Sequence, residues 1–171
     1  MAVSWAVIDS ACERSFEIAW ALASAAGYQV LIADAREAFA RAERFSRVAA
    51  VHVGWPAPAI ESRELGPRDG VIVFSHDPKF DEPAILAALA SDAGYIGALG
   101  SRRTASERNA RLIAAGADPQ ALERVHSPCG LDIGAATPEE VAISIMAEVI
   151  AARSGRAGEP LITTGNSIRP R

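Results

Sequence analysis

Short apolar runs alternate with longer helical segments along this 171-residue chain. The clearest run covers residues 71–75, a continuous apolar stretch typical of parallel strands that are buried on both faces. The expected strands are residues 3–8, 28–33, 48–53, 71–75 and 95–99, and the expected helices are residues 13–26, 82–89, 102–115 and 139–153. Strands and helices that alternate at this spacing predict an α/β fold, in which a parallel, doubly wound sheet forms the middle of three layers.

Turn and cap residues mark where the expected elements begin and end. Residues 137–140 form a capping box with proline at the first helical position, which predicts the start of a long helix. The Asp-Pro pair at residues 118–119 predicts a further short helix in the same way. Residues 54–70 contain three prolines and are expected to be mainly a loop, and residues 125–133 are expected to be extended.

The composition fits one domain with a substantial core. Half of the residues are hydrophobic and 22% are charged, so we expect one domain over residues 1–154 and a tail over residues 155–171. The net charge of −4 disfavours a general electrostatic contact with nucleic acid. Cys12 and Cys129 are too few for a disulfide framework, and no apolar run reaches the roughly 18 residues of a membrane span. We therefore expect a cytoplasmic protein without a nucleic-acid or membrane partner.

Ligands of an open parallel sheet bind beyond the carboxyl ends of its strands. The first such loop, residues 9–14, has no glycine and carries Asp9 and Glu13, so an ordinary capped turn is favoured over a pyrophosphate cradle. Asp34 follows the second strand, where a ribose-binding acid belongs, and Arg36 beside it could take a phosphate. A surface ion pair between these two residues is the alternative interpretation.

The loop after the fourth strand, SHDPKFD, gathers His76, Asp77, Lys79 and Asp81 within a few residues. Lys79 is the one lysine of the chain. The two acids could orient the His76 ring and raise its basicity, as a general base or a ligand requires. They could equally form a turn in which the Asp side chains accept backbone hydrogen bonds, and both hypotheses stay open.

The fifth strand ends in a glycine-rich corner that passes directly into a helix. Gly97, Gly100 and Ser101 are followed by Arg102 and Arg103 in the first helical turn. Cations at this end oppose the helix dipole, whereas free backbone N–H groups together with guanidinium groups bind anions well. The pattern therefore favours an anion site.

A second glycine-rich segment precedes the capped helix. Gly130 and Gly134 flank Asp132, a pattern suited to the close approach of a ligand. Cys129 could act as a nucleophile or sulfur carrier if its thiol were exposed and acidic, but an inert buried thiol is the more frequent case, and the same holds for Cys12. The remaining histidines, 52 and 126, are expected to be structural.

Three segments of the chain resemble a known family in order and spacing. SHDPKFDEPAILAAL, YIGALGSRRT and GLDIGAATPEEVAISIMAEVIAARSG are similar to the C-terminal Rossmann-like domain of the XdhC/CoxI family, over roughly residues 28–155. Members of this family are accessory proteins for molybdenum hydroxylases such as xanthine dehydrogenase.

The resemblance implies a role in maturation. Family members bind the molybdenum cofactor, a pterin that bears a phosphate or nucleotide, while a cysteine desulfurase supplies a terminal sulfur, and they deliver it to the apo-enzyme. The positions that match are expected to bind the cofactor: Asp34, Arg36, His76, Asp77, Lys79, Asp81, Gly97, Gly100, Ser101, Arg102, Arg103, Gly130, Asp132 and Gly134. Ser101, Arg102 and Arg103 would hold the phosphate, and His76, Asp77 and Lys79 the polar head group. No catalytic or metal-binding residue is expected.

The chain departs from the family pattern in one loop. Family members carry a Gly-x-Gly-His turn after the first strand, whereas residues 11–14 here are Ala-Cys-Glu-Arg. Two alternatives to a cofactor-binding accessory protein therefore stay open. One is an NAD(P)-binding module of regulatory or oxidoreductase type, with Asp34 on the ribose, and the other is a ligand-free interaction scaffold. Full-length members have a further N-terminal domain, so a homo-oligomer or a separate partner protein is also possible.

Overall fold

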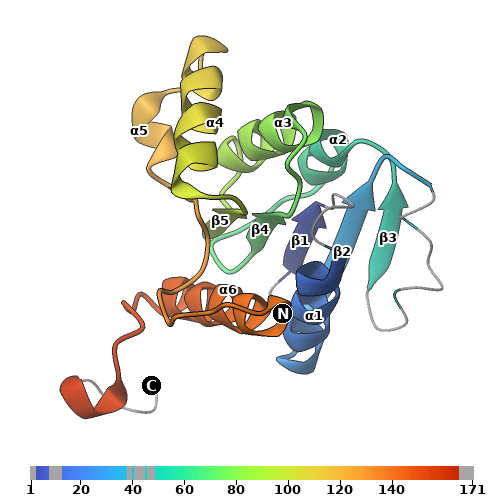
Figure 1. Cartoon of the computed structure of the whole chain (residues 1–171). Helices are drawn as coiled ribbons and strands as arrows, with labels where there is room; N and C mark the ends of the chain where they lie inside the picture. The colour runs from blue at the N-terminus through green and yellow to red at the C-terminus, as the bar shows by residue number, and fades with distance from the viewer. Residues whose placement is uncertain (1–2, 8–12, 38–39, 41–44, 46–48, 166–171) are drawn as a thin grey trace.

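The computed structural model describes residues 3–7, 13–37, 40, 45 and 49–165. Its six parallel strands form one sheet in the order β3-β2-β1-β4-β5-β6 (Figure 1). The strands are β1 (Val3–Val7), β2 (Gln29–Asp34), β3 (Ala50–Val53), β4 (Gly70–Val73), β5 (Tyr95–Ala98) and β6 (Val125–His126). The helices are α1 (Glu13–Ala25), α2 (Pro56–Glu61), α3 (Pro78–Leu89), α4 (Arg102–Ala114), α5 (Pro119–Leu122) and α6 (Pro138–Arg153), and a short 3-10 helix covers Leu161–Thr163.

The helices cover both faces of the sheet and so confirm the expected three-layer, doubly wound architecture. Figure 1 shows α1 and α6 on one face and α2, α3 and α4 on the other. Alternate strand residues fill the two cores, since Leu31 and Val71 pack on the α2–α4 side while Ile32 and Ile72 pack on the α1–α6 side. Burial of each such side chain contributes roughly 1.5–3 kcal/mol.

The structure corrects two expectations about local elements. Residues 56–61 form α2 inside the segment expected to be a loop, because Pro56 and Pro58 lie in the first helical turn, where no N–H group is needed. Helix α3 begins at Pro78, before the expected start at residue 82, because Asp77 caps it and Pro78 takes the first helical position. The expected helix at residues 118–119 is confirmed, while only Val125–His126 of the expected extended segment is strand.

Helix α6 begins with the expected capping box. The Thr137 side chain accepts a hydrogen bond from the Glu140 N–H at 3.2 Å, and Glu140 Oε2 accepts the Thr137 N–H at 3.0 Å. The described residues after α6, 154–165, run away from the three layers in Figure 1. No helix within the described ranges is long and apolar enough to span a lipid bilayer.

Replacement of Thr137 by alanine is expected to lower the free energy of unfolding by about 1 kcal/mol, because the Glu140 N–H loses its acceptor. Thr137→Ser keeps the hydroxyl and should retain most of the stability. Urea denaturation of both variants measures the difference. An equal loss in the two variants would show that the capping hydroxyl is not the cause.

Candidate functional site

The order of the strands defines where a ligand would bind. Chain order reverses between β1 and β4, and open α/β sheets bind ligands beyond the carboxyl ends of the strands at such a point. We call this the carboxyl edge, formed by the segments that follow Asp34, Val53, Val73, Ala98 and His126, the last residues of β2 to β6. Of the glycine-less loop after β1, expected at residues 9–14, residues 9–12 lie outside the described part of the chain, and α1 begins at Glu13.

The corner between β5 and α4 has the geometry of an anion site. Gly100 has a φ of +139°, and a Cβ added there would lie 3.1 Å from the Thr104 side chain. Ser101 caps the helix by accepting the Thr104 N–H at 3.1 Å. The N–H groups of Arg102 and Arg103 are among those that an α-helix leaves without a partner of its own.

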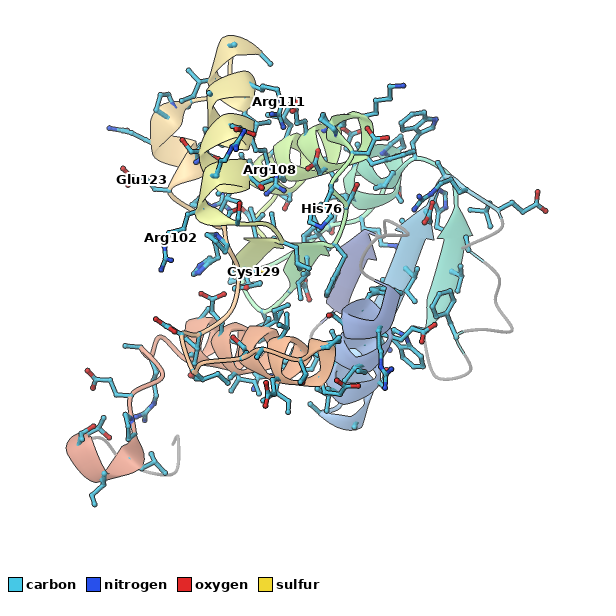
Figure 2. All side chains as sticks on the ribbon, viewed as in Figure 1. His76, Arg102, Arg108, Arg111, Glu123 and Cys129 are labelled. Carbon is cyan, nitrogen blue, oxygen red and sulfur yellow. The ribbon has the colours of Figure 1, made fainter. Side chains whose placement is uncertain are left out.

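The two arginines of this corner differ in their contacts. Arg103 donates from Nε to Glu107 Oε1 at 2.7 Å, an exposed pair one helical turn apart. No ion pair joins Arg102 to any residue that the structure describes, and its exposed side chain lies at the start of α4 (Figure 2). Arg102 is therefore the cation better placed to bind an incoming anion.

An open hollow of about 330 Å³ lies next to this corner, between the β5–α4 turn, the segment after β6 and α6. Its lining residues are Leu99, Gly100, Cys129, Gly130, Leu131, Asp132, Ile133, Gly134, Ala135, Val141 and Ser144. The expected binding glycines 100, 130 and 134 and Asp132 are thus brought to one place. Cys129 is half-buried rather than fully buried, and Figure 2 shows it between the start of α4 and α6.

Glycine is required at residue 130 for two reasons. Its φ is +113°, and a Cβ there would lie 2.5 Å from Ser144 Oγ. The Ser144 hydroxyl in turn donates to the Leu131 carbonyl at 2.6 Å, so α6 fixes the wall of the hollow.

Glu148 of α6 holds the same wall of the hollow in place by hydrogen bonds. Its carboxylate accepts hydrogen bonds from the Tyr95 hydroxyl at 2.6 Å and the Gly130 N–H at 2.7 Å, and it pairs with His126 Nδ1 at 3.0 Å. Burial alone would raise the Glu148 pKa, but the hydrogen bonds from His126, Tyr95 and Gly130 together hold that pKa below its usual range. The hydrogen bond to Glu148 raises the pKa of His126.

Glycine is required at residue 97 for a structural reason that the sequence pattern does not reveal. A Cβ there would lie 2.7 Å from the ring of Tyr95. The missing side chain therefore makes room for the tyrosine that reaches Glu148. Gly97 is not among the residues that line the hollow, although the sequence pattern placed it with the cofactor-binding glycines.

A buried ion pair ties the carboxyl edge together. Arg108 Nε donates to Asp81 Oδ2 at 3.1 Å, and both side chains are at most 2% exposed. The other guanidinium nitrogens donate to Ser127 Oγ at 3.1 Å and to the Leu99 carbonyl at 2.8 Å. Burial raises the pKa of Asp81 despite the opposing charge of Arg108. Asp81, which the family resemblance placed among cofactor-binding residues, is thus enclosed inside the domain.

The remaining residues of the SHDPKFD segment have separate roles. Asp77 accepts the Lys79 N–H at 3.0 Å as the cap of α3, which is the turn interpretation left open by the sequence. The side chains of His76 and Lys79 are exposed, and Figure 2 places His76 where β4 leads into α3. These two residues remain candidates for a polar contact with a ligand.

Asp34 and Arg36 bind each other. Asp34 is buried, and its carboxylate accepts three hydrogen bonds from Arg36. Two come from the guanidinium, from Nε at 3.0 Å and from Nη2 at 2.8 Å, and the third comes from the backbone N–H at 2.8 Å. The Arg36 guanidinium also lies 5.7 Å from the centre of the Phe80 ring, and Phe80 packs on Trp55 with ring centres 5.0 Å apart. The ion pair between Asp34 and Arg36 is thus more enclosed than the surface pair considered from the sequence.

Sequence reasoning missed the most connected residues of the site. Arg108 shares the buried face of α4 with Ala105 and Leu112, a spacing of three and four residues that marks an arginine turned toward the core. Glu148 likewise lies three residues after the buried Ile145 and four after the buried Ser144 of α6. A charged residue on the apolar face of a helix is the signal that could have found both.

Comparison with known proteins bears on the whole of this site. Residues 15–149 match the family described as the XdhC Rossmann domain. The chain is 31% identical over 132 residues to a protein of Bacillus subtilis named as a probable xanthine dehydrogenase subunit, covering 77% of this chain and 38% of that protein. It is also 31% identical over 96 residues to the molybdenum cofactor insertion chaperone PaoD of Escherichia coli, covering 56% of this chain and 30% of that protein.

A solved structure has the same fold over nearly the whole chain. A xanthine dehydrogenase from Bacillus halodurans superposes with a TM-score of 0.74 at 26% identity, over 96% of this chain and 45% of that one. The chain therefore spans less than half the length of each of these relatives.

Loss of the buried charge pair has a predictable cost. Arg108→Met leaves Asp81 buried without its cation and is expected to lower the free energy of unfolding by about 3–5 kcal/mol. The double variant Asp81→Leu/Arg108→Met removes both charges and should recover part of that loss. Urea denaturation of the two variants and the wild type measures it. A double variant no more stable than the single one would contradict the ion-pair explanation.

The contact between His126 and Glu148 makes stability depend on pH. His126 has a folded pKa above its ordinary 6.5, so its contribution is complete below that pH and is lost as pH rises through the folded value. Glu148 has a folded pKa below its ordinary 4.5, so its contribution is lost as pH falls through the folded value. The pair thus stabilises the fold most between these two ordinary values.

Glu148→Gln is accordingly expected to lower the pKa of His126 toward its ordinary value, because the carboxylate that favours the imidazolium is gone. Titration of the His126 ring signals by NMR measures this, with the wild type under identical conditions as the reference. An unchanged His126 pKa would show that Glu148 does not control its titration.

Proposed function

Because this chain belongs to the XdhC Rossmann-domain family, we propose that it is an accessory protein that binds the molybdenum cofactor and serves the maturation of a molybdenum hydroxylase. The observation that carries the proposal is the anion corner beside a glycine-lined hollow. Arg102 of this corner forms no ion pair with any described residue. The match to a molybdenum cofactor insertion chaperone supports the same role.

The donor set of the site fits a phosphate-bearing pterin. Arg102 and the free N–H groups at the start of α4 bind the phosphate, since the positive end of the helix dipole and a guanidinium act together there. The hollow of about 330 Å³ beside them lies within the size range of small-ligand sites. Gly100 and Gly130 keep the backbone close to the ligand, and Asp132 lies at the rim for a polar contact.

The role of the chain is to hold the cofactor. When bound, the molybdenum cofactor brings the redox chemistry that the target enzyme uses, and the residues of this chain bind and orient it. A cysteine desulfurase partner supplies sulfur while the cofactor is held, and the apo-form of a molybdenum hydroxylase receives it. Cys129 lines the hollow and is half-buried.

The buried carboxylate of Asp34 argues against the alternative of an NAD(P)-binding module. A ribose-binding acid must present its oxygens to the ligand, whereas both oxygens of Asp34 accept hydrogen bonds from Arg36. Binding of a dinucleotide in this manner would first have to break that ion pair.

The two arginines of the corner provide a matched test. Arg102→Ala should weaken binding of the molybdenum cofactor by about tenfold or more, because one charge-assisted hydrogen bond to phosphate is worth roughly 1.5–3 kcal/mol. Arg103→Ala removes an identical side chain that pairs with Glu107, and it should change the affinity by less than about threefold. Titration of the purified chain with cofactor released from a molybdoenzyme measures both.

Equal affinities in the wild type and both variants would contradict the phosphate assignment. Inorganic phosphate in excess should compete with the cofactor for the wild type and have a weaker effect on Arg102→Ala. Binding of NAD(H) without binding of the cofactor would replace the proposal by the dinucleotide alternative.

A further inference from the structure

The indole of Trp55 neither caps a helix nor packs in the core. It lies between the end of β3 and the start of α2 and is 53% exposed. It is also the N-cap residue of α2, yet its side chain makes no capping hydrogen bond. Ser, Thr, Asp and Asn are favoured at such positions because their side chains accept the free N–H groups. Positions where a chain departs from local preference in this way are often functional.

The exposed indole is held in place by its neighbours. The rings of Trp55 and Phe80 are stacked with centres 5.0 Å apart and an angle of 30° between their planes. The guanidinium of Arg36 lies 5.7 Å from the centre of the Phe80 ring. Asp34 in turn fixes Arg36 by a two-point ion pair, and its own side chain is 1% exposed.

These contacts join residues that follow three different strands. Arg36 follows β2, Trp55 follows β3, and Phe80 lies in the first turn of α3 after β4. All three therefore lie at the carboxyl edge, the same edge of the sheet as the anion corner at Arg102. We call Trp55, Phe80 and Arg36 the aromatic stack.

We propose that the aromatic stack binds a flat, nitrogen-containing ring of the ligand, a pterin or a nucleobase, with Trp55 as the stacking residue. Indole and guanidinium groups are the side chains on which such rings stack, because both present a flat face and the cation adds attraction. The stack is already assembled without ligand, so binding a ring would cost little side-chain entropy.

A small planar ligand fits this surface better than a protein partner does. Protein-binding patches usually extend over several hundred Å² of contiguous apolar surface. Among the described residues of β3 and α2, Val53 is the one large hydrophobic residue exposed beside Trp55, while Pro56 and Ile60 are buried. The exposed face of the Trp55 indole instead matches the size of one aromatic ring system of a small ligand.

The inference rests on the proposed function, since the ring and the phosphate belong to one ligand. Trp55→Ala should weaken binding of ring-bearing probes, AMP and the molybdenum cofactor, by about tenfold, the usual effect of losing one stacking contact. Ribose 5-phosphate has no aromatic ring, so its inhibition constant in competition with the cofactor should be unchanged. Trp55→Phe keeps an aromatic face and should restore the affinity to within about threefold.

Ile143→Ala is the matched control, because Ile143 is an apolar residue of α6 with a similar exposed fraction, 51%. It should change none of the three constants. Loss of affinity for both AMP and the cofactor would support the stacking role for either kind of ring, and loss for the cofactor, with AMP not bound by the wild type, would identify the ring as the pterin.

The outcomes separate this inference from the proposed function. Cofactor binding that Trp55→Ala leaves unchanged would overturn the stacking role while the proposed function stands. A wild-type chain that binds neither AMP nor the cofactor would overturn both. A variant that keeps its affinity for both probes but no longer binds the apo-enzyme would show that Trp55 contacts a protein, which also overturns the inference.

Discussion

The buried guanidinium of Arg108 is the contact on which the geometry of the carboxyl edge depends. It joins Asp81 of α3, the Leu99 carbonyl directly after β5 and the Ser127 hydroxyl after β6, so three separate segments meet at one charged group. A charge buried this deeply is tolerated because several polar partners surround it. The turn at Gly100 and the segment that leads to Gly130 consequently have fixed positions on two sides of the hollow.

The Glu148 network supports the hollow from the opposite layer. Its carboxylate connects Tyr95 of β5, His126 of β6 and the backbone of Gly130, and Gly97 is small because the Tyr95 ring lies over it. The site is thus a set of backbone turns held by two polar clusters, one from each helical layer. A rigid framework of this kind is consistent with the binding role proposed above.

The fold followed from local patterns, whereas the site depended on distant contacts. Apolar runs and the capping box at α6 predicted the parallel sheet and its helices, because both signals lie within a few residues. Tyr95 and Glu148 are 53 residues apart and Asp81 and Arg108 are 27 apart, so no local pattern could pair them. The same limit explains why the sequence did not indicate that Asp81 pairs with Arg108 or that Gly97 makes room for the Tyr95 ring. The main departure from the family pattern falls on residues 11–14, of which residues 11 and 12 lie outside the described structure.

The central claim is that this chain itself binds the molybdenum cofactor at the carboxyl edge of its sheet. Native mass spectrometry of the purified chain, with and without added molybdenum cofactor, tests this most directly because it reports the mass of whatever is bound. We predict a complex of one cofactor per chain that persists through gentle desalting and that excess phosphate displaces. A chain that stays at its own mass of 17.9 kDa at every cofactor concentration would contradict the claim.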